Sequence, residues 1–509
     1  GGTSASLTST TVVDADRLIL NDDGTMKQIA VTDLNTYLGN ATKLDDLSDA
    51  KSEGDDFTGS LLIGHQTTGT LNTATYNTAV GLTALDAITS GDYNTAMGYD
   101  ALSAHTSGNA NTAMGYRALY QATGGNNTAV GARSLYTNTT GYQNTAVGVY
   151  SLYDNTTGKD NTAVGNTSMD DNTTGDSNTA IGISSLRKNT TGDYNTASGA
   201  DALLWNTTGD NNTASGKGAL YSNTTADNNA AFGYHALYSN TTGLSNTASG
   251  AVALYSNTTG YQNTASGWKA LYQNTTGTNN TGIGKGTLYA NTTGKENTAS
   301  GSLVLDANTT GSYNTASGMQ ALGANTTGDY NTASGYQALY SNTTADWNVA
   351  FGAKALYSNT TGNASTAIGY HALREQTTGG SNTAVGYGAL QENTTGGNNI
   401  GIGGYALDAN TTGASNTAIG NSALTQNTTG DYNTATGYRA LRENTTGDDN
   451  IAMGRDALYA NTTGTKNIAI GSYAYDNADT ELHNLAIGYA ALGGAIAGGE
   501  YNVAIGNYT

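Results

Sequence analysis

Apolar and polar residues follow a fixed period of seventeen residues along most of this chain. One copy, residues 331–347, reads NTASGYQALYSNTTADW, and the next copy begins at Asn348. The general form is N-T-A-x-G-x-x-A-L-x-x-N-T-T-G-x-x, and it recurs about 26 times. Numbered from its first Asn, a copy has Ala at positions 3 and 8, Leu at position 9 and Gly at positions 5 and 15. A short period held over this length predicts a solenoid.

Seventeen residues are too few for a helical repeat, which needs about 33 residues for two packed helices. The repeat is rich in Thr, Asn and Gly, which are poor helix formers. We therefore expect two short strands in each coil, N-T-A-x-G and A-L-x-x-N-T. The two turns would use the Gly at positions 5 and 15, where a positive φ costs little.

Stacking such coils places each side chain above its equivalent, about 4.7–4.8 Å away. Leu at position 9 is the main expected core residue, and Ala at position 3 lets opposing strands approach. The predicted fold is all-β, a β-solenoid or β-roll of about 26 coils. Such a stack would be a rod on the order of 120 Å long.

The residues before the array form a separate segment. Arg17–Leu20 and Met26–Val31 flank an Asp-Gly pair and predict a β-hairpin. We expect residues 1–60 to be an N-terminal cap or assembly segment and residues 61–509 to be the repeat shaft. A solenoid needs atypical ends because an open coil exposes unpaired backbone groups.

Composition narrows the function classes. Charged residues make up only 11% of the chain, and the formal net charge is −20. Nucleic acid is an unexpected partner, because phosphate binding needs clustered Lys and Arg. The sequence contains no apolar run of about twenty residues, which is the length that would predict a membrane-spanning helix. Cys is absent, so neither disulfides nor thiolate chemistry can occur.

Repeats such as N-T-A-V-G-Y-G-A-L at 382–390 resemble the repeat arrays of tail-fibre-like structural proteins of tailed phages, notably marine ones. Residues 17–24 and 59–65 resemble the segment that precedes such arrays. The N-x-A-[IV]-G core is also similar to the head repeats of trimeric autotransporter adhesins, which form left-handed β-rolls with three chains side by side. This resemblance implies an elongated attachment structure and a homotrimer.

The N-T-T motif at positions 12 to 14 is formally a sequon for N-glycosylation. Because it occupies one fixed place in each coil, we favour a structural interpretation, in which ladders of Asn and Thr satisfy backbone groups of the turn. Rows of Thr on a β-solenoid can also order water, so ice binding is a further hypothesis. The motif begins, among other places, at Asn138, Asn155, Asn172, Asn189, Asn206, Asn240 and Asn257.

Tyr recurs at position 10 and, less often, at position 6, and the file at position 10 forms the principal candidate surface. Stacked aromatic side chains could pack as a ladder or lie between chains. They could instead bind a saccharide or a receptor, because aromatic rings suit sugar rings. The stripe comprises Tyr120, Tyr136, Tyr153, Tyr221, Tyr238, Tyr255, Tyr272, Tyr289, Tyr340 and Tyr357.

Acidic residues near the second turn could bind calcium, although solvated turns are the favoured interpretation because a calcium site needs several converging oxygens. They are Asp193, Asp210, Asp329, Asp431, Asp448 and Asp449. We expect no cofactor and no metal site. No acid–base pair or nucleophile interrupts the repeat, so we expect a protein that is not an enzyme.

The most economical hypothesis is a structural fibre protein, the shaft of an extracellular or virion appendage that serves attachment. The expected partners are further copies of the chain, as a homotrimer or a head-to-tail filament, and a cell-surface glycan or receptor. The alternatives are a subunit of a self-polymerising extracellular filament and an ice-binding β-solenoid.

Overall fold

The computed structural model describes residues 17–22, 25–30, 50–52, 59–63, 73–477, 479–494 and 499–509. Within these residues every regular element is a β-strand. The chain divides into two compact units, Gly1–Asn211 and Asn212–Thr509. Both units contain stacked seventeen-residue coils, so the predicted all-β solenoid is confirmed.

The first unit holds twelve described strands, nearly all of three residues. They are β1 (Arg17–Asp22), β2 (Thr25–Ala30), β3 (Ala50–Ser52), β4 (Leu61–Ile63), β5 (Thr78–Val80), β6 (Thr95–Met97), β7 (Thr112–Met114), β8 (Thr128–Val130), β9 (Thr145–Val147), β10 (Thr162–Val164), β11 (Thr179–Ile181) and β12 (Thr196–Ser198).

The described strands of the second unit all have three residues and lie one coil apart. They are β13 (Thr213–Ser215), β14 (Ala230–Phe232), β15 (Thr247–Ser249), β16 (Thr264–Ser266), β17 (Thr281–Ile283), β18 (Thr298–Ser300), β19 (Thr315–Ser317), β20 (Thr332–Ser334), β21 (Val349–Phe351), β22 (Thr366–Ile368), β23 (Thr383–Val385), β24 (Ile400–Ile402), β25 (Thr417–Ile419), β26 (Thr434–Thr436), β27 (Ile451–Met453), β28 (Ile468–Ile470), β29 (Leu485–Ile487) and β30 (Val503–Ile505).

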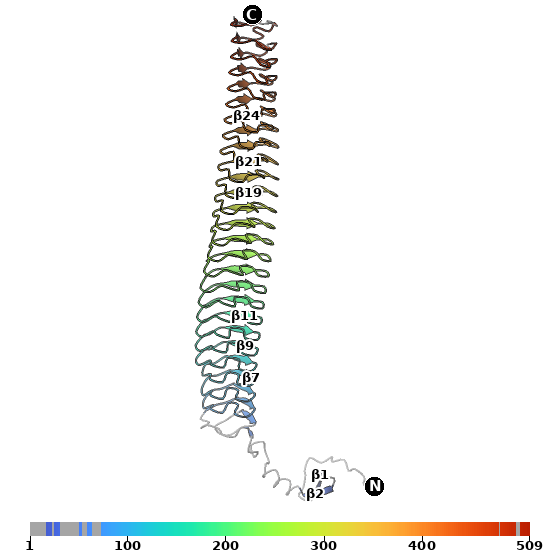
Figure 1. Ribbon diagram of the computed structural model, residues 1–509. Coiled ribbons are helices and arrows are strands. Elements are labelled where there is room, and N and C mark those ends of the chain that lie inside the picture. The colour runs from blue at the N-terminus through green and yellow to red at the C-terminus, as the bar shows by residue number, and fades with distance from the viewer. Residues whose placement is uncertain are drawn as a thin grey trace, which may run out of the picture. The chain divides into compact units, whose positions relative to one another are not determined.

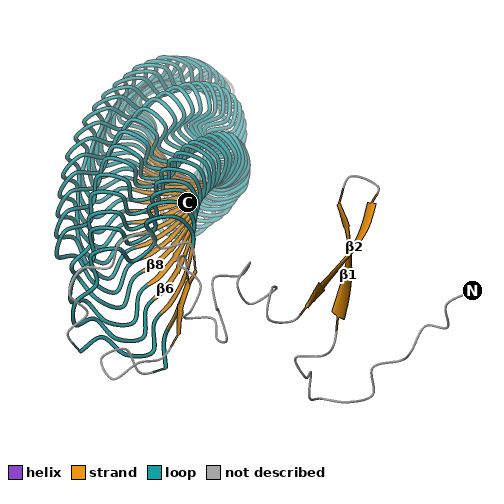
Figure 2. Ribbon diagram, turned by 90° about the horizontal axis from the view of Figure 1, so that it is seen from below, coloured by secondary structure: helices purple, strands orange, loops and turns teal. Residues whose placement is uncertain are grey.

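Within each unit, consecutive coils pair through parallel strands in strict register. Thr162 lies opposite Thr179, and Thr315 lies opposite Thr332. From β4 to β12 and from β13 to β30, each strand therefore lies against the next (Figure 1), and successive coils within a unit are turned slightly relative to one another (Figure 2). The sixteen-residue step from Thr112 to Thr128 keeps the same pairing, so the turns absorb the missing residue.

The expectation of two strands per coil is wrong, because each described coil has one strand at positions 2 to 4. The segment A-L-x-x-N-T forms turns instead. Its first two residues, such as Ala338 and Leu339, are both fully buried. A strand cannot do this, since its successive side chains point to opposite faces.

Hydrogen bonds within one coil trace its path out and back. In the coil 331–347, the Ala338 N–H donates to Gly335 O (3.3 Å) and closes a tight turn at positions 5 to 8. The side-chain amides of Asn331 and Asn342 both donate to Ala345 O, at 2.8 and 3.1 Å. Position 1 thus lies beside positions 12 and 15, and the second turn closes the coil there.

Left-handed residues produce this compact path. Positions 7, 9 and 17 have positive φ without being Gly, as at Gln337 (53°), Leu339 (52°) and Trp347 (58°). A left-handed conformation costs such a residue roughly 1–2 kcal/mol. The Leu339 N–H donates to Ala355 O of the next coil at 3.0 Å, so the strained residue still contributes to the stack.

The two glycine positions differ in what they require. Gly267, at position 5, has φ +132°, and a Cβ there would lie 2.5 Å from Gly284 O of the next coil. The expected positive φ is absent at position 15, and glycine there permits a close approach instead. A Cβ on Gly192 would lie 2.5 Å from Gly209 O. Ala226 and Ala345 occupy this position in two coils, so the neighbouring coil can adjust.

The core is narrow and only partly apolar. Ala at positions 3 and 8 and Leu at position 9 are buried in coil after coil, as predicted for Leu. Asn at positions 1 and 12 is equally buried, for example Asn161 and Asn172 at 0% exposure. The interior therefore consists of apolar and amide files running side by side.

The start of the chain contains the expected hairpin. Strands β1 and β2 pair antiparallel, with Arg17 opposite Ala30, which confirms the prediction; the Asp-Gly turn lies outside the described residues. Strand β3 pairs antiparallel with β4, which pairs in parallel with β5. Most of residues 1–60 lie outside the described part, so the boundary at 60 stays a prediction.

Candidate functional site: stacked side-chain files

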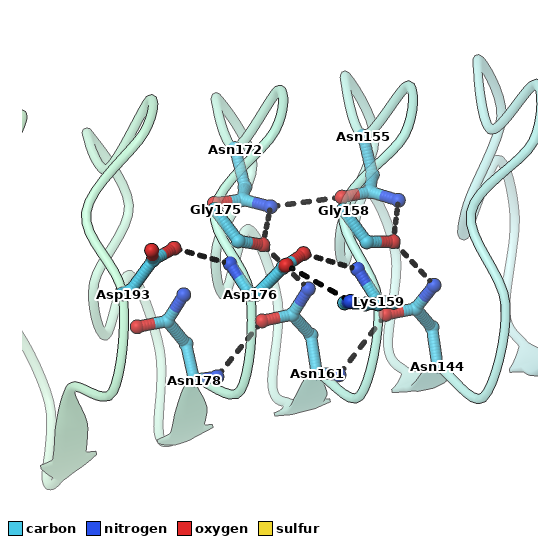
Figure 3. A network of polar contacts seen from close by, with 10 residues as sticks. All are labelled: Asn144, Asn155, Gly158, Lys159, Asn161, Asn172, Gly175, Asp176, Asn178 and Asp193. Atoms are coloured by element: carbon cyan, nitrogen blue, oxygen red, sulfur yellow. Dashed lines mark hydrogen bonds and ion pairs between the residues drawn. The ribbon is translucent and has the colours of Figure 1, made fainter.

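Two files of Asn side chains join neighbouring coils from inside (Figure 3). At position 1, the Asn178 N–H donates to Asn161 Oδ1 at 2.9 Å, and Asn161 Nδ2 donates to Gly175 O at 2.8 Å. At position 12, Asn172 Nδ2 donates to Asn155 Oδ1 at 2.8 Å and to Gly175 O at 3.1 Å. Each amide thus bonds both along the stack and across its own coil, which satisfies polar groups that would be costly to bury alone.

The N-T-T motif is part of this interior network. The Asn of the motif is fully buried at every position named above, so its amide is out of reach of a glycan in the folded coil. The first Thr is tied to the backbone, since Thr156 Oγ1 donates to Thr173 O at 2.9 Å. The structural interpretation of the motif as Asn and Thr ladders is confirmed.

The Tyr residues at position 10 stack in runs rather than in one continuous stripe. Neighbouring rings lie 4.8–5.4 Å apart and are parallel within 11°. Asp170 and Asp306 interrupt the file. The runs are Tyr120, Tyr136 and Tyr153; Tyr221, Tyr238, Tyr255, Tyr272 and Tyr289; and Tyr340 and Tyr357.

This stacking changes what the Tyr file can bind. All ten side chains are half-buried, and a ring inside a run has a neighbour against each face. A sugar ring stacks on an aromatic face, so these rings present only edges and hydroxyls to a ligand. This applies to the rings that stack on both faces, whereas the rings that end a run stack on another Tyr of the file on one face only. Saccharide binding at the Tyr file stays a prediction.

More exposed aromatic rings lie at position 6, where the sequence already showed recurring Tyr, and at position 17, which the sequence analysis did not single out. Position 17 contributes Tyr194 (64%), Trp347 (59%) and Tyr432 (64%), and position 6 contributes Tyr234 (52%) and Tyr387 (51%). Both positions flank the strand at the two turns. The usable signal for position 17 was the return of Tyr or Trp there, which the denser Tyr file at position 10 obscured.

Cations at position 7 lie against aromatic rings. Lys269, at position 7, lies 5.4 Å from the Tyr272 ring centroid and 4.7 Å from the Trp268 ring centroid. Lys354 lies 5.5 Å from the Tyr357 centroid. These cation–π contacts contribute roughly 0.5–1 kcal/mol each at exposed sites.

The acidic residues of the second turn form a hydrogen-bonded file at position 16. Asp193 Oδ1 accepts from the Asp176 N–H at 2.7 Å, and Asp346 Oδ1 accepts from the Asp329 N–H at 2.7 Å. Among the described residues no group of three or more His, Asp or Glu side chains could hold a metal ion. These Asp side chains therefore order the turn.

Two carboxyls at position 10 have a raised pKa. Burial, helped by the nearby Asp171, raises the pKa of Asp170 to about 6. Burial together with Glu392 raises the pKa of Asp408 to about 6. The surface beside the Tyr file is thus a poor environment for an isolated negative charge.

A small open hollow lies near the end of the second unit. Its volume is about 180 Å³, and it is lined by Arg439, Asp456, Tyr459, Tyr473 and Asp476 together with Asn477. Ligand sites usually measure roughly 300–1,000 Å³. Arg439 and Asp456 form an ion pair there at 2.8 Å.

Comparisons with known proteins give no match to a protein-family model, to a curated protein or to a solved structure. In the part of the chain that the structure describes, no helix is long and apolar enough to cross a membrane.

Proposed function

We propose that this chain is a structural fibre protein, the repetitive shaft of an extracellular or virion appendage that holds an attachment function away from its base. The observation that carries the proposal is the equivalence of the coils. In both units the same interior amide bonds link coil to coil, as Asn172 to Asn155 and Asn427 to Asn410, each at 2.8 Å. A stack of nearly identical elements suits a spacer better than a single binding pocket.

The bonds along the stack suit a structure that bears load. Side-chain bonds from positions 1, 12 and 13 join each coil to the next, in addition to the strand pairing. In the second unit these include the Asn297 N–H to Asn280 Oδ1 (3.0 Å), Asn308 Nδ2 to Asn291 Oδ1 (2.8 Å) and Thr309 Oγ1 to Thr326 O (3.0 Å). Bending or stretching must therefore break several buried hydrogen bonds together.

A deletion in register tests the spacer role. Removing residues 246–330 joins Ser245 to Asn331 and takes out five whole coils. We expect a folded protein whose particles are shorter by about 24 Å in electron micrographs, at 4.8 Å per coil. Removing residues 246–322 instead leaves a partial coil and should disrupt folding. An unchanged particle length after the first deletion would contradict the proposal.

Head-to-tail polymerisation is the first alternative. In the first unit β3 already pairs with the edge of β4 that a further coil would use. This covered edge favours a shaft of defined length. Particles of one length in electron micrographs would support the shaft, and fibres of indefinite length would support the filament.

Ice binding is the second alternative. Thr at position 2 points outward from the strand, as at Thr145, Thr162 and Thr179, all partly exposed. Successive coils are turned relative to one another, however, so this file does not stay flat over many coils (Figure 2). Thermal hysteresis at millimolar protein would favour ice binding over the shaft.

A further inference from the structure

The two turns of the coil carry opposite charge in the second unit. We define the short-turn edge as positions 6 and 7 of the fifteen regular coils from Asn212 to Lys466, and the long-turn edge as positions 13 to 17 of the same coils. The turn at positions 5 to 8 joins the strand to the returning segment, and the other turn closes the coil. The two edges therefore lie at opposite ends of each coil.

The short-turn edge is basic. Its only acidic residue is Asp456, and its formal net charge is +5. Its cations are Lys217, Lys269, Lys285, Lys354, Arg439 and Arg455.

Among these, Lys269, Lys285 and Lys354 contact aromatic rings. Arg439 and Arg455 pair with Asp456.

The long-turn edge is acidic. Lys295 and Lys466 are its only cations, and its formal net charge is −5. Its acids are Asp227, Glu296, Asp329, Asp346, Asp431, Asp448 and Asp449.

Exposed aromatic rings accompany both signs of charge. Tyr330 (50%), Trp347 (59%) and Tyr432 (64%) lie on the acidic edge, and Tyr234 (52%) and Trp268 (48%) lie on the basic edge. Aromatic residues are enriched at protein interfaces, and complementary charge orients the partners.

We propose that copies of this chain associate side by side, with the short-turn edge of one copy against the long-turn edge of the next. The two edges have matching formal charge of opposite sign, and both repeat once per coil. A second copy therefore presents an edge of opposite charge at the same spacing as the coils that it contacts. Because the edges differ, the contact is heterologous and leaves each copy with one edge to bind a further copy.

Parallel copies in register bring several of these opposite charges together. Three coils carry a cation on one edge and an acid on the other: Lys217 with Asp227, Lys285 with Glu296, and Arg439 with Asp448. Placing equal coils side by side brings each of these pairs together across the contact. Lys354 then lies one coil from Asp346.

Salt dependence is the first test, on the full chain by sedimentation velocity. The screening length falls from roughly 30 Å at 0.01 M salt to about 3 Å at 1 M. We expect species heavier than one chain of 51.8 kDa at low salt and single chains at high salt. A single chain at every salt concentration would overturn the proposal.

The sharper test removes four charges from the long-turn edge and keeps its hydrogen bonds. In the variant Asp329→Asn/Asp346→Asn/Asp431→Asn/Asp448→Asn the ladder should persist, because Asn363 Oδ1 already accepts the Asp346 N–H at 2.8 Å. Edge docking predicts association that is about tenfold to a hundredfold weaker. General repulsion predicts the opposite, because the net charge of −20 becomes less negative by four.

A matched variant controls for total charge. The substitutions Glu375→Gln, Glu392→Gln, Asp408→Asn and Glu443→Gln remove four negative charges from positions 10 and 11, away from both edges. This control should associate at least as strongly as the parent chain. Equal weakening in both variants, or no weakening in either, would overturn edge docking. Particle length at 1 M salt tests the shaft separately, so the two proposals can fail independently.

Discussion

The Asn file inside the coil and the Tyr file outside it repeat at the same spacing but differ in how strictly they are kept. From Asn138 to Asn461, position 12 departs from Asn only at Gln376. Position 10 accepts Asp, Arg, Leu, Gly and Thr within the same range. The interior Asn amide must hydrogen-bond to backbone and side-chain partners at once, whereas an outer Tyr ring only stacks on the rings next to it. Buried hydrogen bonding, and not stacking, fixes the residue at a repeat position.

The largest expected contrast comes from two adjacent residues. Leu254→Asp puts an unpaired carboxylate into the narrow core, and we expect a loss of about 3–5 kcal/mol in the free energy of unfolding. Tyr255→Asp should cost much less, because position 10 holds Asp natively at Asp306 and Asp408. Chemical denaturation of both variants measures the difference. Equal stability of the Leu254 variant and the parent would refute the inward assignment of position 9.

The interior file is broken by Asn274→Ala. Asn274 Nδ2 donates to Asn257 Oδ1 (2.8 Å) and Gly277 O (3.0 Å), and its Oδ1 accepts from Asn291. Leaving these groups without a partner should cost about 3 kcal/mol. Asn363→Ala at the exposed position 16 is the control, with an expected cost near 1 kcal/mol or below. Equal melting temperatures for the two variants would contradict the comparison.

The outer file is broken by Tyr255→Thr. Tyr255 stacks on Tyr238 at 5.2 Å and on Tyr272 at 5.3 Å, whereas Tyr289 ends its run and stacks only on Tyr272. At roughly 0.5–1.5 kcal/mol per pair, Tyr255→Thr should cost about twice as much as Tyr289→Thr. Thermal denaturation of the two variants tests the ratio. An equal loss in both would show that stacking contributes little.

The smallest expected effect comes from His105→Asn, which restores Asn at position 12 of the interior file. This side chain occupies position 12 and contacts Ala122 O and Gly108 O, at 2.8 and 2.7 Å. Burial lowers its pKa below the usual 6.5. The stability that neutral His105 contributes is therefore present above pH 6.5 and is lost as pH falls through the lowered pKa.

We therefore expect His105→Asn to raise the melting temperature more at pH 5 than at pH 8. All other titrating groups are shared with the parent, so the comparison isolates this side chain. A gain that does not depend on pH would exclude the titration of His105 as its cause.

The stacking of equivalent residues from coil to coil could be predicted from the sequence, but the backbone path within each coil could not. A strict period implies that equivalent residues stack, and it placed Leu at position 9 in the core. The prediction of a second strand in each coil was wrong because the adjacent side chains of Ala338 and Leu339 both point inward. Only a left-handed Leu339 allows this, and propensity alone never favours that conformation in Leu.

The candidate surface was only partly predictable for a similar reason. The Tyr recurrence at position 10 correctly indicated a stacked file. The period carries no information on which rings are most exposed, because exposure depends on the path within the coil. Opposite charge at the two turns became visible only once Lys269 and Asp329 could be assigned to opposite ends of a coil.

The interior amide files also affect how this protein ages. Asn side chains are chemically fragile in water, and their usual decay begins when the backbone nitrogen of the following residue attacks the side-chain carbonyl. Here that nitrogen is held by the neighbouring coil: the Thr162 N–H donates to Asn178 O at 2.8 Å, and the Thr173 N–H donates to Thr190 O at 2.9 Å. Dozens of Asn residues are thereby protected from deamidation for as long as the coils stay stacked, which makes the fold itself the source of chemical durability.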